Sequence, residues 1–121
     1  MLTFSVGYDL YTAGYTEDGY PYTAERYFVA ATDDNGNRWI HSSQHDGCRV
    51  EQDEEGMDRF IDIRDEAKAH CERLVARINA VGGVINLDHW TETRPEYGSI
   101  AYQQYGQHAD YIAERMESAN Y

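Results

Sequence analysis

Basic side chains are scarce in this chain of 121 residues. Lys and Arg number 10 against 22 Asp and Glu, Lys68 is the sole lysine, and the formal net charge is −12. A protein field of this sign repels nucleic acids and anionic membrane surfaces and attracts basic protein surfaces. We therefore expect no direct binding to nucleic acid or to a membrane. The charge also exceeds the magnitude of about 2–8 that keeps a small designed domain soluble.

Cysteine and long apolar runs are also scarce. Two cysteines, Cys48 and Cys71, cannot define a disulfide framework. No run of about 18 apolar residues is present, so we expect no transmembrane helix. Residues 1–6 lack the basic segment that begins a signal peptide. These features predict a cytoplasmic protein of a bacterial host cell.

Catalytic motifs are missing from the sequence. It contains no G-x-S-x-G elbow, no H-E-x-x-H and no glycine-rich phosphate loop. We therefore predict that the protein is not an enzyme and uses no cofactor. His41, His45 and Cys48 lie close together and His70-Cys71 could complete a zinc site, but their spacing matches no standard finger or ribbon. An enzyme or metalloprotein that uses these residues is kept as an alternative.

The sequence pattern predicts a single α+β domain over residues 1–121. Alternating residues predict a strand over residues 2–11, followed by a loop over 12–21 with Gly14 and Gly19. Residues 22–32 and 38–43 read as strands around Asn35-Gly36, a strong hairpin signal. Residues 44–58 are polar and turn-rich, with a short edge strand at 48–50.

The clearest helix is predicted over residues 62–81. Its apolar residues from Ile63 to Val81 recur at spacings of three and four, and Gly82-Gly83 ends it. Short helices are predicted around 99–105 and over 107–118. The predicted fold is therefore a small antiparallel sheet of three to four strands packed against one long helix, with short C-terminal helices.

An acidic stretch over residues 51–66 carries half of the net charge, with eight acidic side chains against Arg59 and Arg64. Spaced carboxylates on a rigid surface can imitate the phosphates of a duplex, which lie about 1.7 Å apart along its axis. A solvated loop followed by ordinary helix N-terminal charges is the simpler interpretation. The candidate partner-binding acids are Glu51, Asp53, Glu54, Glu55, Asp58, Asp62, Asp65 and Glu66.

Tyrosine dominates the aromatic residues, with 11 Tyr against 3 Phe and 2 Trp. Tyr15 and Tyr20 decorate the predicted loop over residues 12–21. Aromatic rings beside carboxylates suit arginine-rich surfaces, through cation–π contacts and ion pairs. We therefore add Tyr15 and Tyr20 to the candidate partner-binding residues, while sheet packing accounts for other tyrosines.

Two features resemble known proteins. Residues 82–90 (GGVINLDHW) and 95–102 (PEYGSIAY) resemble the C-terminal part of small proteins from bacterial mobile elements. The size, the acidity and the lack of motifs resemble anti-CRISPR proteins of phages. That resemblance implies an inhibitor of a CRISPR effector, which occupies the nucleic-acid groove as many of those proteins do, or acts as an enzyme or a dimeriser as others do. It assigns no residue a role, because those proteins share no common motif.

The leading hypothesis is an inhibitor that binds a basic nucleic-acid-binding protein or complex, most simply a CRISPR-Cas effector, and blocks its nucleic-acid binding. The alternative is a mobile-element accessory protein that binds a host protein without imitating nucleic acid. A homodimer is left open, since exposed tyrosines mark self-association as well as partner binding.

Overall fold

Two long strands, β1 (Thr3–Tyr15) and β2 (Pro21–Thr32), organise the fold in the computed structural model, which describes residues 1–83 and 86–104. They pair antiparallel along their length, with one bulge beside Gly14. The sequence predicted both strands but ended the first at residue 11. The loop over 12–21 was wrong in extent, because β1 continues through the bulge and only residues 16–20 connect the strands.

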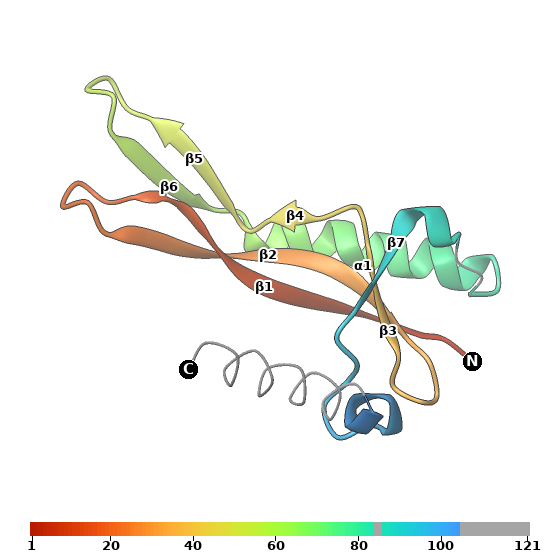
Figure 1. The fold of residues 1–121 in the computed structure, drawn as a ribbon. Helices are drawn as coiled ribbons and strands as arrows, with labels where there is room; N and C mark the ends of the chain where they lie inside the picture. Colours follow the sequence, from red (N-terminus) through yellow and green to blue (C-terminus); the bar gives the residue numbers. More distant parts are fainter. Residues whose placement is uncertain (84–85, 105–121) are drawn as a thin grey trace, which may run out of the picture.

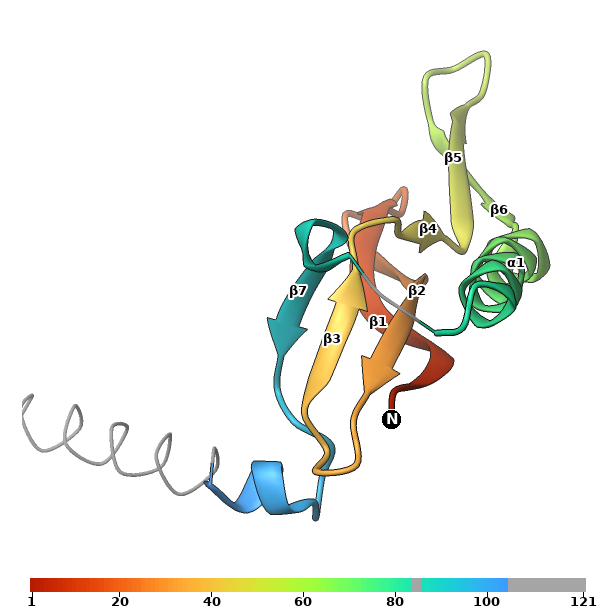
Figure 2. The ribbon, with the colours of Figure 1, turned by 90° about the vertical axis from the view of Figure 1, so that its right-hand side faces the viewer.

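Three short strands complete a five-stranded antiparallel sheet (Figures 1 and 2). The order is β1-β2-β3-β7, and β4 pairs with β2 as well. The strand predicted over residues 38–43 is present as β3. The predicted count of three to four strands was too low, because β4 and β7, with two and four residues, carry no alternating pattern. The short strands are β3 (Arg38–His41), β4 (His45–Asp46) and β7 (Trp90–Thr93).

A second hairpin lies where the sequence predicted only an edge strand at 48–50. Strands β5 (Cys48–Gln52) and β6 (Asp58–Asp62) form a separate two-stranded sheet. The sequence pattern missed β6 because its residues, DRFID, begin and end with Asp, a residue depleted in strands. The acidic stretch is therefore built mainly on a β-hairpin and not on the first turns of a helix.

The three hairpin loops, residues 16–20, 33–37 and 53–57, share one construction. Each begins with Thr or Asp and has Gly at its fourth position, and each Gly has a positive φ. In the middle loop the Asp33 carboxylate accepts hydrogen bonds from the backbone N–H groups of Asn35 and Asn37, both at 2.9 Å. The Asn37 side-chain amide also donates to this carboxylate at 2.9 Å, and that bond, together with the backbone bonds, lowers the pKa of Asp33. The predicted Asn35-Gly36 hairpin is therefore present, with Gly36 alone in the left-handed region among the described residues of that loop.

The helix α1 (Arg64–Ala80) packs against β1 and β2. The prediction of 62–81 was too long at both ends. Asp62 belongs to β6, and Val81 is 71% exposed although its spacing placed it on the apolar face. The chain turns away after Val81 because Gly82 and Gly83 adopt positive φ.

The core lies between α1 and the face of the sheet that it covers (Figure 2). Of the alternating residues predicted in the first strand, those up to Val6 pack against this core, but Tyr8 and Leu10 are 55% and 66% exposed. The buried core residues are Tyr27, Val29, Ala31, Ala67, Cys71 and Trp90, with Leu2, Phe4, Val6, Trp39, Leu74, Val75 and Ile78 packed around them.

The segment after β7 returns to the 33–37 loop. The N–H of Glu96 donates to the carbonyl of Gly36, and the N–H of Ala101 donates to that of Asn35, at 2.9 and 3.0 Å. Residues 100–104 are helical, where a short helix was predicted around 99–105. The helix predicted over 107–118 lies outside the described residues. Within residues 1–83 and 86–104, no helix combines the length and apolarity needed to span a membrane.

Because of Tyr27, we expect the protein to lose stability at alkaline pH. Its side chain is 2% exposed and its hydroxyl donates to the Glu25 carboxylate, and burial foremost raises its pKa to about 12. An unfolded tyrosine ionises near 10, so the folded chain holds this proton more tightly and stability falls as pH rises from 10 towards 12. By pH 11 the free energy of unfolding has fallen by on the order of 1 kcal/mol through the ionisation of this one tyrosine. Urea unfolding of wild type and Tyr27→Phe at pH 9 and about 11 measures it; equal losses in both proteins would contradict this prediction.

Candidate partner-binding surface

The distal part of the β1–β2 hairpin and the β5–β6 hairpin project from the same end of the molecule (Figure 1). They touch where the Tyr22 ring stacks on the Phe60 ring, with centroids 4.0 Å apart and planes 10° from parallel. Gly14 allows this approach, because a Cβ there would lie 3.0 Å from the Phe60 ring. We call residues 14–22 and 48–60 the double-hairpin end.

The base of the β5–β6 hairpin is fixed to the main sheet through Gly47. Its N–H donates to the carbonyl of Glu25 at 2.7 Å, and its carbonyl accepts from the N–H of Ile63 at 2.9 Å. A side chain at this position would collide with the Glu25 backbone, because a Cβ would come within 2.8 Å of that carbonyl oxygen. The hairpin therefore leaves the sheet at a point where the backbones on both sides are hydrogen-bonded, and its base is held in place.

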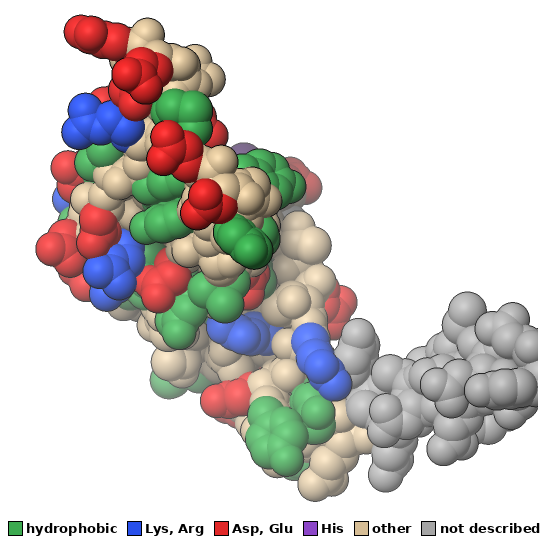
Figure 3. Space-filling view, turned by 90° about the vertical axis from the view of Figure 1, so that its left-hand side faces the viewer, with side chains coloured by type: hydrophobic (Ala, Val, Ile, Leu, Met, Phe, Trp, Pro, Cys, Tyr) green, Lys and Arg blue, Asp and Glu red, His purple; other side chains and the backbone are tan. Residues whose placement is uncertain are grey.

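The double-hairpin end is strongly acidic. It holds seven carboxylates against two guanidiniums, a formal net charge of −5. The Arg49 guanidinium lies 3.0 Å from the Glu51 carboxylate, a solvent-exposed pair of small energetic value. Figure 3, which views the molecule from this end, shows acidic side chains with hydrophobic ones between them. The seven acids are Glu17, Asp18, Glu51, Asp53, Glu54, Glu55 and Asp58.

Tyr15 and Tyr20 lie at the same end of the molecule as the acids of the β5–β6 hairpin, and they belong to the neighbouring β1–β2 hairpin. Tyr15 is the last residue of β1 and Tyr20 is the last of the loop, and they are 61% and 68% exposed. The structure thus brings together two sets of predicted residues that lie about 30 to 40 positions apart in the sequence. Their rings and the nearby carboxylates are available together to a cationic partner surface.

Three predicted acids lie away from the tip. Asp62 ends β6 at the base of the hairpin, where its carboxylate accepts from the Arg64 guanidinium at 2.9 Å and from the Arg64 N–H at 3.0 Å. These bonds lower the pKa of Asp62. Asp65 and Glu66 occupy the first turn of α1, where their charges favour the positive end of the helix dipole. All three have a local structural role in addition to any contact with a partner.

Asp53 also has a structural role, although it lies at the tip. Its carboxylate accepts from the N–H groups of Glu55 and Met57, both at 2.9 Å, as Asp33 does in its own loop. Glu54 and Glu55 are exposed, and Glu51 is exposed beside Arg49. Asp58, the first residue of β6, is half-buried. The β5–β6 hairpin therefore carries one carboxylate that builds the loop, the half-buried Asp58 and three exposed glutamates.

The sequence interpretation missed two acids of this surface. Glu17 and Asp18 occupy the exposed 16–20 loop, which brings them to the end of the molecule that carries the acidic stretch. The sequence did contain a signal for this arrangement, which is the repeated loop pattern of Thr or Asp followed by Gly three residues later. The same pattern occurs at 16–20 and at 53–57, and it indicates that both segments are hairpin loops.

The residues of the metal alternative do not form a ligand set in the described part of the chain. Cys71 is 1% exposed within the core and Cys48 is 8% exposed, and burial raises the pKa of both thiols. His45 stacks on His70 with ring centroids 4.8 Å apart. Across residues 1–83 and 86–104, no group of three or more His, Cys, Asp or Glu side chains is arranged to hold a metal ion.

Comparison of the chain with protein-family models, with curated proteins and with solved structures finds no match.

Proposed function

We propose that this protein is an inhibitor of the anti-CRISPR type that acts in the cytoplasm of a bacterial cell. It binds a basic nucleic-acid-binding complex, most simply a CRISPR-Cas effector, and prevents nucleic acid from entering. The observation that supports this proposal is the double-hairpin end, where seven carboxylates and the exposed rings of Tyr15 and Tyr20 gather on two adjacent hairpins.

Charge favours a cationic groove as the binding partner. Seven carboxylates near one another repel, and a surface rich in Arg and Lys relieves that repulsion while steering the two proteins together. Tyr15 and Tyr20 add contacts to guanidinium groups, which bind aromatic faces. Such a groove is what an effector presents to the phosphates of its guide and target strands.

Shape supports the same partner. Each hairpin is a ribbon of two strands, about 5 Å between strand axes, and the two ribbons project beyond the helix-covered part of the sheet (Figure 1). A narrow acidic projection can enter a groove that a flat sheet face cannot. Inhibition of this kind needs occupancy alone and no catalytic group.

The test is capture from a bacterial lysate that contains CRISPR and restriction complexes, at low and at high salt, with identification by mass spectrometry. We expect recovery of a nucleic-acid-binding effector at low salt and a steep loss at high salt, because exposed charge pairs are screened beyond about one Debye length. Failure to recover any nucleic-acid-binding complex would contradict the proposal.

A second candidate is an accessory protein that binds a host protein without imitating nucleic acid. The exposure of Tyr8 and Leu10 on β1, at 55% and 66%, favours it, because neighbouring exposed apolar side chains can contact an apolar partner. Its partner would be retained at high salt, and that result in the capture experiment would select this function over the first.

A further inference from the structure

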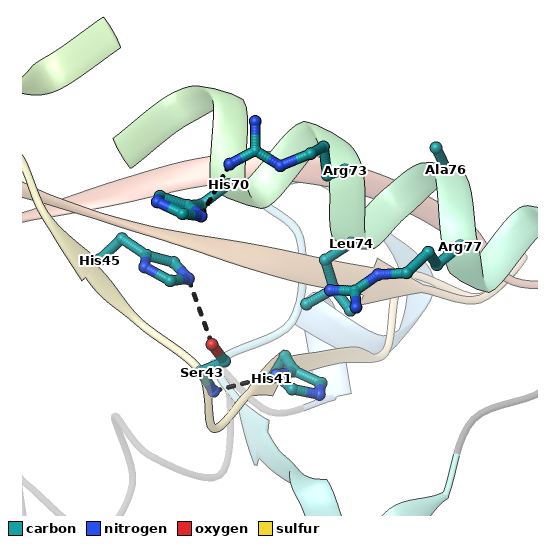
Figure 4. A pocket seen from close by; sticks show the side chains of 8 residues that line it. All are labelled: His41, Ser43, His45, His70, Arg73, Leu74, Ala76 and Arg77. Atoms are coloured by element: carbon teal, nitrogen blue, oxygen red, sulfur yellow. Dashed lines mark hydrogen bonds between the residues drawn. The ribbon is translucent and has the colours of Figure 1, made fainter. Parts of the chain in front are cut away.

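A second polar site lies beside the core, where α1 faces the segment between β3 and β4, away from the double-hairpin end. A groove of about 640 Å³ runs between α1 and the segment that joins β3 to β4 (Figure 4). Its polar side chains come from two separate parts of the chain, residues 41–45 and 70–77. They are His41, Ser43, His45, His70, Arg73 and Arg77.

The charge of this groove is opposite to that of the protein. Three of the five histidines and two of the ten basic residues line it, while the described lining contains no carboxylate. Arg73 and Arg77 lie four residues apart on α1 and therefore on the same face. In a chain of net charge −12, two adjacent guanidiniums without a lining acid are a local excess of positive charge that an anion would neutralise.

Hydrogen bonds orient the side chains as donors. The Arg73 guanidinium lies 2.8 Å from His70 Nδ1, and the N–H of Ser43 donates to His41 Nδ1 at 2.9 Å. Since Nδ1 of each ring accepts, the proton of the neutral ring resides on Nε2, which becomes a donor. His45 is stacked on His70 and lies 3.2 Å from the Ser43 hydroxyl through its Nε2.

Burial and nearby positive groups disfavour the charged forms of His41 and His45 in the groove. Burial lowers the pKa of His45, and the facing His70 and Arg73 lower it further, while Asp46 opposes them. Burial also lowers the pKa of His41, and His89 and Arg77 add to the effect. A bound dianion would reverse this balance, because an opposite charge within a few ångströms stabilises the protonated ring.

We propose that this groove binds the phosphate group of a small phosphorylated molecule, with Arg73 and Arg77 as its principal contacts and His45, His70 and Ser43 as further donors. Guanidinium groups pair with phosphate through two parallel N–H···O bonds. The groove volume lies within the range of about 300–1,000 Å³ typical of small-molecule sites and exceeds what one phosphate needs. Leu74 and Ala76 line the same groove and supply apolar contact for the organic part.

The first test is calorimetric titration of the full chain with inorganic pyrophosphate at about pH 6. The double variant Arg73→Gln/Arg77→Gln should weaken binding about tenfold or more, since hydrogen bonds to charged groups are the stronger kind. The control is Arg49→Gln/Arg59→Gln, which removes the same charge from the β5–β6 hairpin and should bind as wild type does. No binding by wild type, or equal weakening in both variants, would overturn the proposal.

The second test uses sulfate, which keeps its two charges across the range in which histidine titrates. We expect tighter binding at about pH 5.5 than at about pH 8, with proton uptake on binding, because burial holds the pKa of His41 and His45 below the ordinary value of about 6.5 and a bound dianion raises it. Histidine ring signals in NMR spectra should shift when pyrophosphate is added. Unchanged ring signals in the folded wild-type protein would also overturn the proposal.

Discussion

Replacing three exposed glutamates of the β5–β6 hairpin by lysine, as Glu51→Lys, Glu54→Lys and Glu55→Lys, is expected to weaken binding to the captured effector about a hundredfold or more. Each reversal turns an attraction to the basic groove into a repulsion, and like charges across an interface cost several kcal/mol. Asp53 is left unchanged, because its carboxylate holds the loop that presents the other three. Affinity is measured by titration with the purified effector.

The matched control for this variant reverses three exposed glutamates elsewhere. Glu72 lies on α1, Glu92 on β7 and Glu96 in the segment after it, all outside the double-hairpin end. Each triple variant changes the formal net charge from −12 to −6, so the two differ in where the charge is reversed and not in how much. Unchanged affinity in the hairpin variant, or an equal loss of affinity in both variants, would show that the β5–β6 hairpin is not part of the interface.

Trp90→Ala is expected to lower the free energy of unfolding by about 3–5 kcal/mol. Trp90 begins β7, is 9% exposed, and belongs to the core. Its ring lies 6.0 Å from that of Phe4 and meets His41 edge-on at 5.0 Å. Because a domain of this size is stabilised by roughly 5–15 kcal/mol, the variant should lie near the limit of folding.

Urea unfolding followed by circular dichroism measures this cost, with Tyr97→Ala as the control. Tyr97 is 86% exposed, so its removal should change the stability by about 0.5 kcal/mol or less. A cost below about 1 kcal/mol for Trp90→Ala would show that β7 does not close the core.

The parts of the fold that the sequence predicts correctly are those with a strong local pattern. Asn35-Gly36 between two β-prone runs fixes the β2–β3 hairpin, and the apolar spacing over residues 67–78 fixes α1. In contrast, β4 and β7 pair with strands far away in the sequence, so a run of two or four residues gives no signal of its own. Asp62 was assigned to the helix because an acid suits a helix start as well as a strand end.

The candidate surface was predictable as a set of residue types, and its arrangement was not. The acids of residues 51–58 and the rings of Tyr15 and Tyr20 carried the signal, but their hairpins are joined by the stacking of Tyr22 on Phe60. That contact is tertiary and leaves no periodicity. The groove beside α1 that we propose to bind phosphate also had a sequence signal. His70, Arg73 and Arg77 recur at helical spacing on one face of α1, and the sequence interpretation did not use this pattern.

Competition between this protein and nucleic acid for the captured effector tests the central claim most directly. The effector is mixed with its labelled target strand and with increasing amounts of the protein, and the complexes are separated by gel mobility. Our account predicts that the protein and the nucleic acid displace each other from the effector and that no complex contains both. The Glu51→Lys/Glu54→Lys/Glu55→Lys variant should no longer displace the nucleic acid. A stable complex of the effector with the protein and the nucleic acid together would contradict it.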